Sequence, residues 1–209
     1  IRIPSNVVNI GNQAFQNCTG LTSVVFLNSM DTIEWDTFSG CTSLTSVTLP
    51  STLLTIASRA FENCTSLNEI QLPDSIEFLY EHAFYNCSNL TSVNYPKAWN
   101  YTIGYGYQAR SPFEGCTISS IVVPEGVTNL PDGAFGYLTS LKTVELPSTL
   151  MVISDYSFAE ATELIAVKLG SQVTSISSNA FDNHNAKLTF YGETGSYAET
   201  YAKENSISF

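Results

Sequence analysis

Basic residues are scarce in this chain of 209 amino acids. Eight Lys and Arg stand against 19 Asp and Glu, which gives a formal net charge of −11. Binding to nucleic acid or to an anionic membrane surface depends on clustered Lys and Arg, so neither is expected as a partner. Charged residues of both signs make up only 13% of the chain, about half of the usual share. This composition excludes a charge-rich disordered chain.

Long apolar runs are missing as well. No stretch approaches the ~20 apolar residues of a membrane-spanning helix, so we expect no membrane insertion. Histidine is rare: His82 and His184 are the two in the chain, and neither lies in a pattern typical of a nucleophile–His–acid set. The glycines at 104 and 106 lack the third glycine and the strand–helix unit of a dinucleotide site. We therefore expect no enzyme, no catalytic residues and no cofactor.

The chain does have a strong internal repeat. Successive repeated Phe residues are 23 positions apart in five of seven intervals, and the other two intervals are 29 and 22. The repeated residues are Phe15, Phe38, Phe61, Phe84, Phe113, Phe135, Phe158 and Phe181. A clean unit, residues 53–73, follows the pattern V/L-x-x-I-x-x-x-A-F-x-N-C-x-x-L-x-x-V-x-L-P. A unit of this size cannot bury its own apolar face, so the units are predicted to stack into a solenoid.

Each unit is predicted to contain one short strand. In residues 44–50, Val47 and Leu49 alternate with polar residues and are expected to point inward. The proline that follows ends the strand, because it has no N–H to donate. The run before the Phe, such as residues 56–61, is predicted to be a tight turn or one short helical turn. Strands stacked at ~4.8 Å per unit give a rod roughly 35–40 Å long.

The form I-x-x-x-A-F-x-N-C-x-x-L-x-x-V-x-L-P resembles the BspA-like leucine-rich repeat family. The resemblance implies a repeat solenoid that is a right-handed β/α superhelix, with one parallel sheet and short helical turns on the other side. It also implies a secreted or cell-surface protein of a host-associated bacterium or parasitic protist. The expected function is adhesion to host or extracellular-matrix proteins.

The repeat defines the predicted domains. Residues 1–192 are expected to form about eight units with an insertion at 97–112, and residues 193–209 a C-terminal cap. The first unit is partial, because residues 1–4 correspond to residues 47–50. We therefore expect a fragment of a longer protein, whose upstream region would hold any secretion signal.

The C-terminal cap is predicted to be a helix followed by a short strand. The helix covers residues 196–205, with Ser196 as its N-cap and Glu199 completing a capping box. The strand lies around Ile207. A solenoid needs such an element to cover its open end.

The insertion is the first candidate binding site. Pro96 and Phe113 lie 17 positions apart in the sequence, whereas the same pair in other units lies 11 positions apart. Insertions in solenoids form loops, often on a binding face, and Trp, Tyr and Arg are enriched at interaction hot spots. The candidate residues are Trp99, Tyr101, Tyr105, Tyr107 and Arg110. Alternatively, these aromatic residues cover a gap in the core where the repeat register jumps.

The outward positions of the predicted sheet are the second candidate site. They carry short, mostly neutral polar side chains, among which Glu69, Gln71 and Asn94 suit hydrogen bonding to an extended protein or a glycan. The alternative is that these polar side chains only keep the protein soluble and bind no partner.

All five cysteines occupy one slot, three residues after the Phe: Cys18, Cys41, Cys64, Cys87 and Cys116. Later units place Leu138, Ala161 and His184 there, so we expect buried thiols. No metal site is expected, because the chain has no C-x-x-C pair and no His at ligand spacing. Disulfides between neighbouring units are conceivable at the expected spacing, but the odd number argues against them.

These observations together favour a non-enzymatic binding module whose partner is an extracellular or host protein. One alternative is a structural spacer, which predicts that changing the insertion alters no binding. Another is glycan recognition by Trp99 and the Tyr residues of the insertion, which predicts saturable binding of a soluble oligosaccharide.

Overall fold

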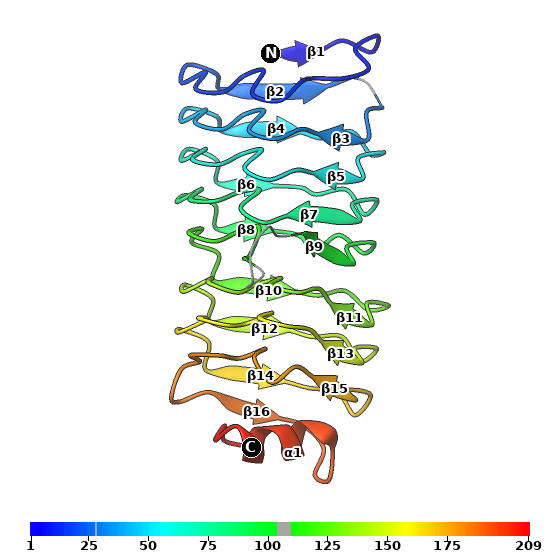
Figure 1. The fold of residues 1–209 in the computed structure, drawn as a ribbon, viewed down its shortest axis with the longest axis vertical. Coiled ribbons are helices and arrows are strands. Elements are labelled where there is room, and N and C mark those ends of the chain that lie inside the picture. The colour runs from blue at the N-terminus through cyan, green and yellow to red at the C-terminus, as the bar shows by residue number, and fades with distance from the viewer. Residues whose placement is uncertain (28, 104–109) are drawn as a thin grey trace.

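A computed structural model of the protein describes residues 1–27, 29–103 and 110–209. The chain winds into an elongated solenoid, and its successive turns lie one above another (Figure 1). Its short strands form two ladders. The first ladder contains β1 (Arg2–Ile3), β2 (Ser23–Phe26), β4 (Ser46–Thr48), β6 (Glu69–Ile70), β8 (Ser92–Val93), β10 (Ser120–Val122), β12 (Thr143–Glu145), β14 (Ala166–Lys168) and β16 (Thr189–Tyr191). The second contains β3 (Thr32–Ile33), β5 (Thr55–Ile56), β7 (Phe78–Tyr80), β9 (Tyr101–Ile103), β11 (Asn129–Leu130), β13 (Val152–Ile153) and β15 (Ser175–Ile176).

All paired strands are parallel, and each residue pairs with the one a single repeat further along the chain, as in Val24 with Val47 and Ile33 with Ile56. The predicted parallel solenoid is confirmed. The second ladder was not predicted, because residues 56–61 were assigned to a turn. Thr55 and Ile56 instead form β5, and tight turns follow them. A strand of two residues is too short for alternation to reveal it in the sequence.

The turns depend on a left-handed backbone at one slot. The residue two positions after the repeated Phe has a positive φ in all eight units: Asn17, Gly40, Asn63, Asn86, Gly115, Tyr137, Glu160 and Asn183. Gly and Asn reach this conformation most easily, which explains the Asn of the repeat pattern. Tyr137 and Glu160 adopt it with φ of 60°.

The repeated Phe side chains stack along the solenoid axis and form the centre of the core. From Phe15 to Phe113, successive ring centroids are 5.2–5.4 Å apart and the rings lie within 12° of parallel. Phe158 and Phe181 continue the arrangement at 5.0 Å. All eight rings except Phe15 are buried. Each unit therefore depends on the units above and below it for its burial.

The insertion interrupts both ladders at the same level of the solenoid (Figure 1). β8 and β10 belong to separate sheets, and so do β9 and β11. At this level Trp99 lies edge-on to Phe113, at 6.2 Å and 83°, and to Phe135, at 6.0 Å and 84°. The indole thus connects the two halves of the Phe stack.

The helix predicted over residues 196–205 is α1 (Tyr197–Glu204), which lies across the last turn (Figure 1). The side chain of its N-cap, Ser196, accepts a hydrogen bond from the backbone N of Glu199. Tyr201 is buried, and its ring stacks on Phe190 at 6.2 Å. The apolar side of the helix therefore closes this end of the core.

The residues after α1 return to the first ladder. In place of a full strand around Ile207, Ser208 forms an isolated parallel bridge with Thr189, and Ile207 is buried. Within the described ranges, no helix has the length and hydropathy that crossing a membrane requires.

Candidate functional site

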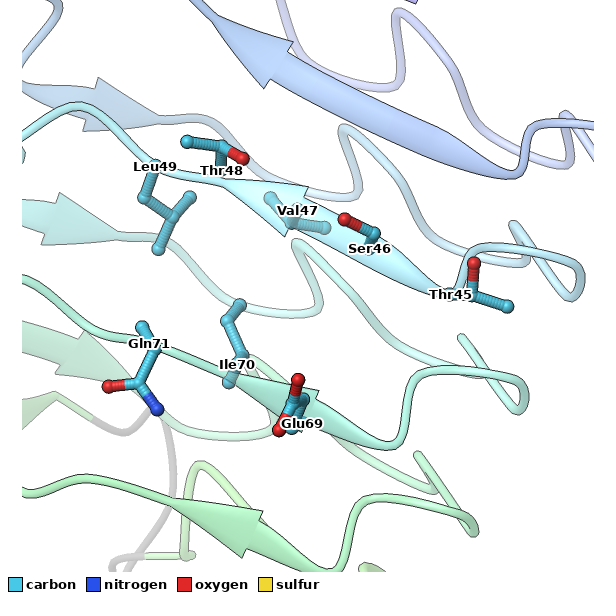
Figure 2. A pocket seen from close by; sticks show the side chains of 8 residues that line it. All are labelled: Thr45, Ser46, Val47, Thr48, Leu49, Glu69, Ile70 and Gln71. Carbon is cyan, nitrogen blue, oxygen red and sulfur yellow. The ribbon is translucent and has the colours of Figure 1, made fainter.

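The first ladder is open between β4 and β6, which belong to separate sheets. A hollow of about 330 Å³ lies between them, and Figure 2 shows side chains from both strands around it. The inward-facing Val47 and Leu49 are half-buried here, whereas Ile70 beside them is buried. The hollow therefore has an apolar floor between polar strand residues.

Glu69 and Gln71 lie on the β6 side of this hollow and are exposed (Figure 2). Thr45 and Thr48 line the β4 side of the hollow and are exposed as well. A partner can place an apolar side chain on the floor while its polar groups meet this rim. Two of the three predicted sheet residues thus share one hollow.

Asn94 has a structural role. Its Oδ1 accepts a hydrogen bond from the backbone N of Leu72 at 2.7 Å, and its Nδ2 donates to the Leu72 carbonyl oxygen at 2.7 Å. The side-chain amide thus takes the place of a backbone peptide and extends the pairing of β6 with β8. Asn94 also lines a second hollow of about 410 Å³, between β8 and β10, together with Asp74 and Lys97. Its amide is already engaged and is less available to a partner than Glu69 or Gln71.

The aromatic residues of the insertion have different environments. Trp99 is only 1% exposed, and its Nε1 donates to the carbonyl oxygen of Tyr101 at 3.0 Å. This placement corrects the prediction of Trp99 as an accessible contact residue, because the interrupted Phe stack takes up the ring. Tyr101 is 58% exposed. The candidates Tyr105 and Tyr107 lie outside the described residues.

Arg110 belongs to a charged cluster on the turns. Its Nη1 lies 3.1 Å from Oε1 of Glu114, and its guanidinium lies 4.0 Å from the centre of the Tyr137 ring. The second carboxylate oxygen of Glu114 lies 3.1 Å from Nε2 of His82. The side chains of His82, Arg110 and Glu114 line a hollow of about 310 Å³, and Arg59 lines it as well. These contacts hold the end of the insertion on the neighbouring turns, and they place His82 within hydrogen-bond distance of Glu114.

The cysteines form a ladder of free thiols. Four of them, Cys41, Cys64, Cys87 and Cys116, are buried, and each Sγ donates to the carbonyl oxygen of the preceding unit's repeated Phe at 3.1–3.3 Å. Burial and the neighbouring Cys64 raise the pKa of Cys41 to about 12. A hydrogen bond with Cys87, and then burial, raises the pKa of Cys64 far above its ordinary value. In the described part of the chain, no three His, Cys, Asp or Glu side chains are grouped to hold a metal ion.

The thiols are expected to differ sharply in reactivity with Ellman's reagent. In the folded protein only Cys18 should react fast, because it is the one exposed cysteine and the thiolate is the nucleophile. All five thiols should react in guanidinium chloride. A Cys18→Ser variant is the control and should show no fast phase. Fast reaction of a second thiol in the native protein would contradict the buried ladder.

Two features of these surfaces were not predicted. Val47 and Leu49 follow the same repeat pattern as the closed units, so nothing in the sequence marks the opening between β4 and β6. Thr102 did carry a signal. It occupies the β9 slot that is Ile33 in β3 and Ile56 in β5, so one polar residue interrupts an aliphatic column.

Comparison with protein families matches the family described as BspA type leucine-rich repeat region, in six copies over residues 1–111 and 108–208. A crystal structure of a T. pallidum leucine-rich repeat protein is 31% identical, with a TM-score of 0.61, over 70% of this chain and 69% of that chain. A leucine-rich repeat protein from Bacteroides ovatus is 18% identical, with a TM-score of 0.52, over 93% of this chain and 71% of that chain. The second likeness is one of fold. Comparison with curated proteins gives no match.

Proposed function

The chain belongs to the BspA-type leucine-rich repeat family, and from that premise we propose that it is a non-enzymatic binding module of a secreted or cell-surface protein that adheres to an extracellular or host protein. Leucine-rich repeat proteins generally act as protein-interaction modules, and a solenoid offers an extended surface for them. The observation that carries the proposal is the hollow between β4 and β6.

This hollow supplies an apolar anchor on the sheet face. Binding energy concentrates where an apolar side chain fills a pocket and polar groups around it exclude water. The half-buried Val47 and Leu49 form such a floor, and the exposed Glu69 and Gln71 form part of the rim.

The proposal is tested by binding to an array of extracellular-matrix and host cell-surface proteins. For a protein that binds, the double variant Glu69→Ala/Gln71→Ala is expected to weaken the Kd at least tenfold, which corresponds to about 1.4 kcal/mol. Biolayer interferometry with the immobilised wild type and variant gives the two values.

The chain offers a matched control. Thr143 and Glu145 occupy the equivalent slots in β12, where the ladder is closed on both sides. Thr143→Ala/Glu145→Ala also removes one Glu and one polar side chain, and should change the Kd less than about twofold. Equal losses in both variants would move the site away from the hollow. If no protein of the array binds, the proposal fails and the spacer alternative stands.

A further inference from the structure

The second ladder is interrupted between β9 and β11, and a hollow of about 200 Å³ lies there. On the other side of β9, the backbone N atoms of Asn100 and Tyr101 both donate to the carbonyl oxygen of Glu77 at 3.3 Å. The same pair of bonds recurs between β11 and β13, where Met151 and Val152 donate to Thr128. Among the described residues, no such bond joins β9 to β11. Backbone polar groups at this level therefore border the hollow instead of a neighbouring strand.

Thr102 lines the same hollow, and its unpartnered hydroxyl is buried beside it. It pairs in register with Leu79, and its side chain occupies a column that is otherwise aliphatic: Ile33, Ile56, Leu79, Leu130, Ile153 and Ile176. Its Oγ1 is buried and has no hydrogen-bond partner among the described residues. A buried hydroxyl without a partner destabilises the folded protein, and a ligand that supplies a partner removes that penalty.

Tyr101 provides an aromatic surface beside this hydroxyl. Its ring stacks on Phe78 of the preceding unit, with centroids 5.4 Å apart and an interplanar angle of 14°. Because Phe78 covers the ring from the β7 side, the opposite ring face is directed along the axis toward β11 and the hollow. Tyr101 is 58% exposed, so a ligand can reach this face from solvent.

The remaining rim is polar and carries one charge. Asn129, on β11, is exposed, and Asp132 follows it three residues later. Oδ1 of Asp132 accepts a hydrogen bond from the backbone N of Asp155 at 3.2 Å. Amide and carboxylate groups serve hydroxyl-rich ligands, whereas the carboxylate disfavours an anionic one.

We propose that the hollow between β9 and β11 binds one neutral pyranose ring of a glycan. The C–H face of the sugar packs on the free face of Tyr101. Rotation of the Thr102 side chain about χ1 brings its hydroxyl to one sugar hydroxyl, and others pair with Asn129 and Asp132. Aromatic face, inward hydroxyl and polar rim are the three groups of contacts that an amphipathic sugar ring needs. This site lies on the second ladder and does not depend on the protein-binding surface between β4 and β6.

The test is saturation-transfer NMR of the wild-type protein with methyl β-D-glucopyranoside, methyl β-D-galactopyranoside and methyl α-D-mannopyranoside, followed by titration of any sugar that binds. Tyr101→Ala is expected to weaken the Kd about tenfold, and Tyr101→Phe to leave it nearly unchanged. The matched control is Tyr191→Ala, because Tyr191 is 56% exposed on β16 of the other ladder. This control should bind sugar as the wild type does.

Thr102→Val separates the hydroxyl from the packing. The substitution preserves the side-chain shape and removes the unpartnered group, so the Tm of the sugar-free protein should rise by roughly 2–4 °C. Sugar binding should weaken about threefold to tenfold in the same variant. A more stable protein that binds sugar less well is not expected of a merely structural residue.

Three outcomes would overturn the proposal. The first is the absence of saturation transfer to all three pyranosides. The second is transfer that Tyr101→Ala and Tyr191→Ala reduce equally. The third is an effect of Tyr101→Ala on the binding of an extracellular protein but on no sugar, which would assign the hollow to a protein interface.

Discussion

Replacing Phe84 by alanine is expected to lower the free energy of unfolding by about 3–5 kcal/mol. The ring is fully buried and lies between two others, 5.2 Å from Phe61 and 5.4 Å from Phe113. Truncation removes both stacking contacts and leaves a cavity that the neighbouring turns, held by their ladders, can fill only in part. Equilibrium urea unfolding followed by circular dichroism measures the change.

Phe15→Ala is the matched control for this variant. Phe15 is half-buried and stacks on Phe38, so its truncation should lower the free energy of unfolding by about half as much. The Phe84 variant should also unfold less cooperatively, because each unit contacts only its neighbours and the weakened interface lies in the middle of the array. A loss below about 1 kcal/mol for Phe84→Ala would show that the Phe stack does not carry the core.

The period of the solenoid could be read from the sequence because the same repeat length sets the spacing of the repeated Phe residues and the register of the paired strands. The spacing between Phe15 and Phe38 in the sequence is also the register between Val24 and Val47 in the ladder. The burial of four cysteines followed in the same way, since a slot that also accepts Leu138 and Ala161 has to be apolar, whereas the expected burial of Cys18 was wrong, because that residue is exposed. A slot that recurs in many units has a similar packing environment in each of them. Its burial can therefore be inferred from several residues at once.

Features that occur once were not predictable in this way. The opening between β4 and β6 lies in a stretch where the repeat spacing is intact, so the repeat gives no sign of it. Asn94 looks like any outward polar residue, and only its two bonds to Leu72 reveal a substitute for backbone pairing. The sequence of an insertion does not show whether an aromatic ring faces solvent or the core. The direction of Trp99 is set by the gap between the rings of two successive units, Phe113 and Phe135.

Trp99→Ala is expected to lower the free energy of unfolding by about 3–5 kcal/mol. The indole is almost fully buried and fills the interrupted level of the stack between Phe113 and Phe135. Trp99→Phe should lose much less, about 1–2 kcal/mol, because it keeps an aromatic ring but loses the hydrogen bond from Nε1 to Tyr101. Urea unfolding of both variants measures the difference.

Tyr101→Ala completes this comparison. Tyr101 is exposed and stacks only on Phe78 among the described rings, so its truncation should cost at most about 1 kcal/mol. The opposite ranking, with Tyr101 more important for stability than Trp99, would contradict the role assigned to the indole. The single variants are essential, because changing all the aromatic residues of the insertion together would combine a folding defect from Trp99 with a lost contact at Tyr101. Loss of binding can be assigned to the insertion only when Trp99 is left in place.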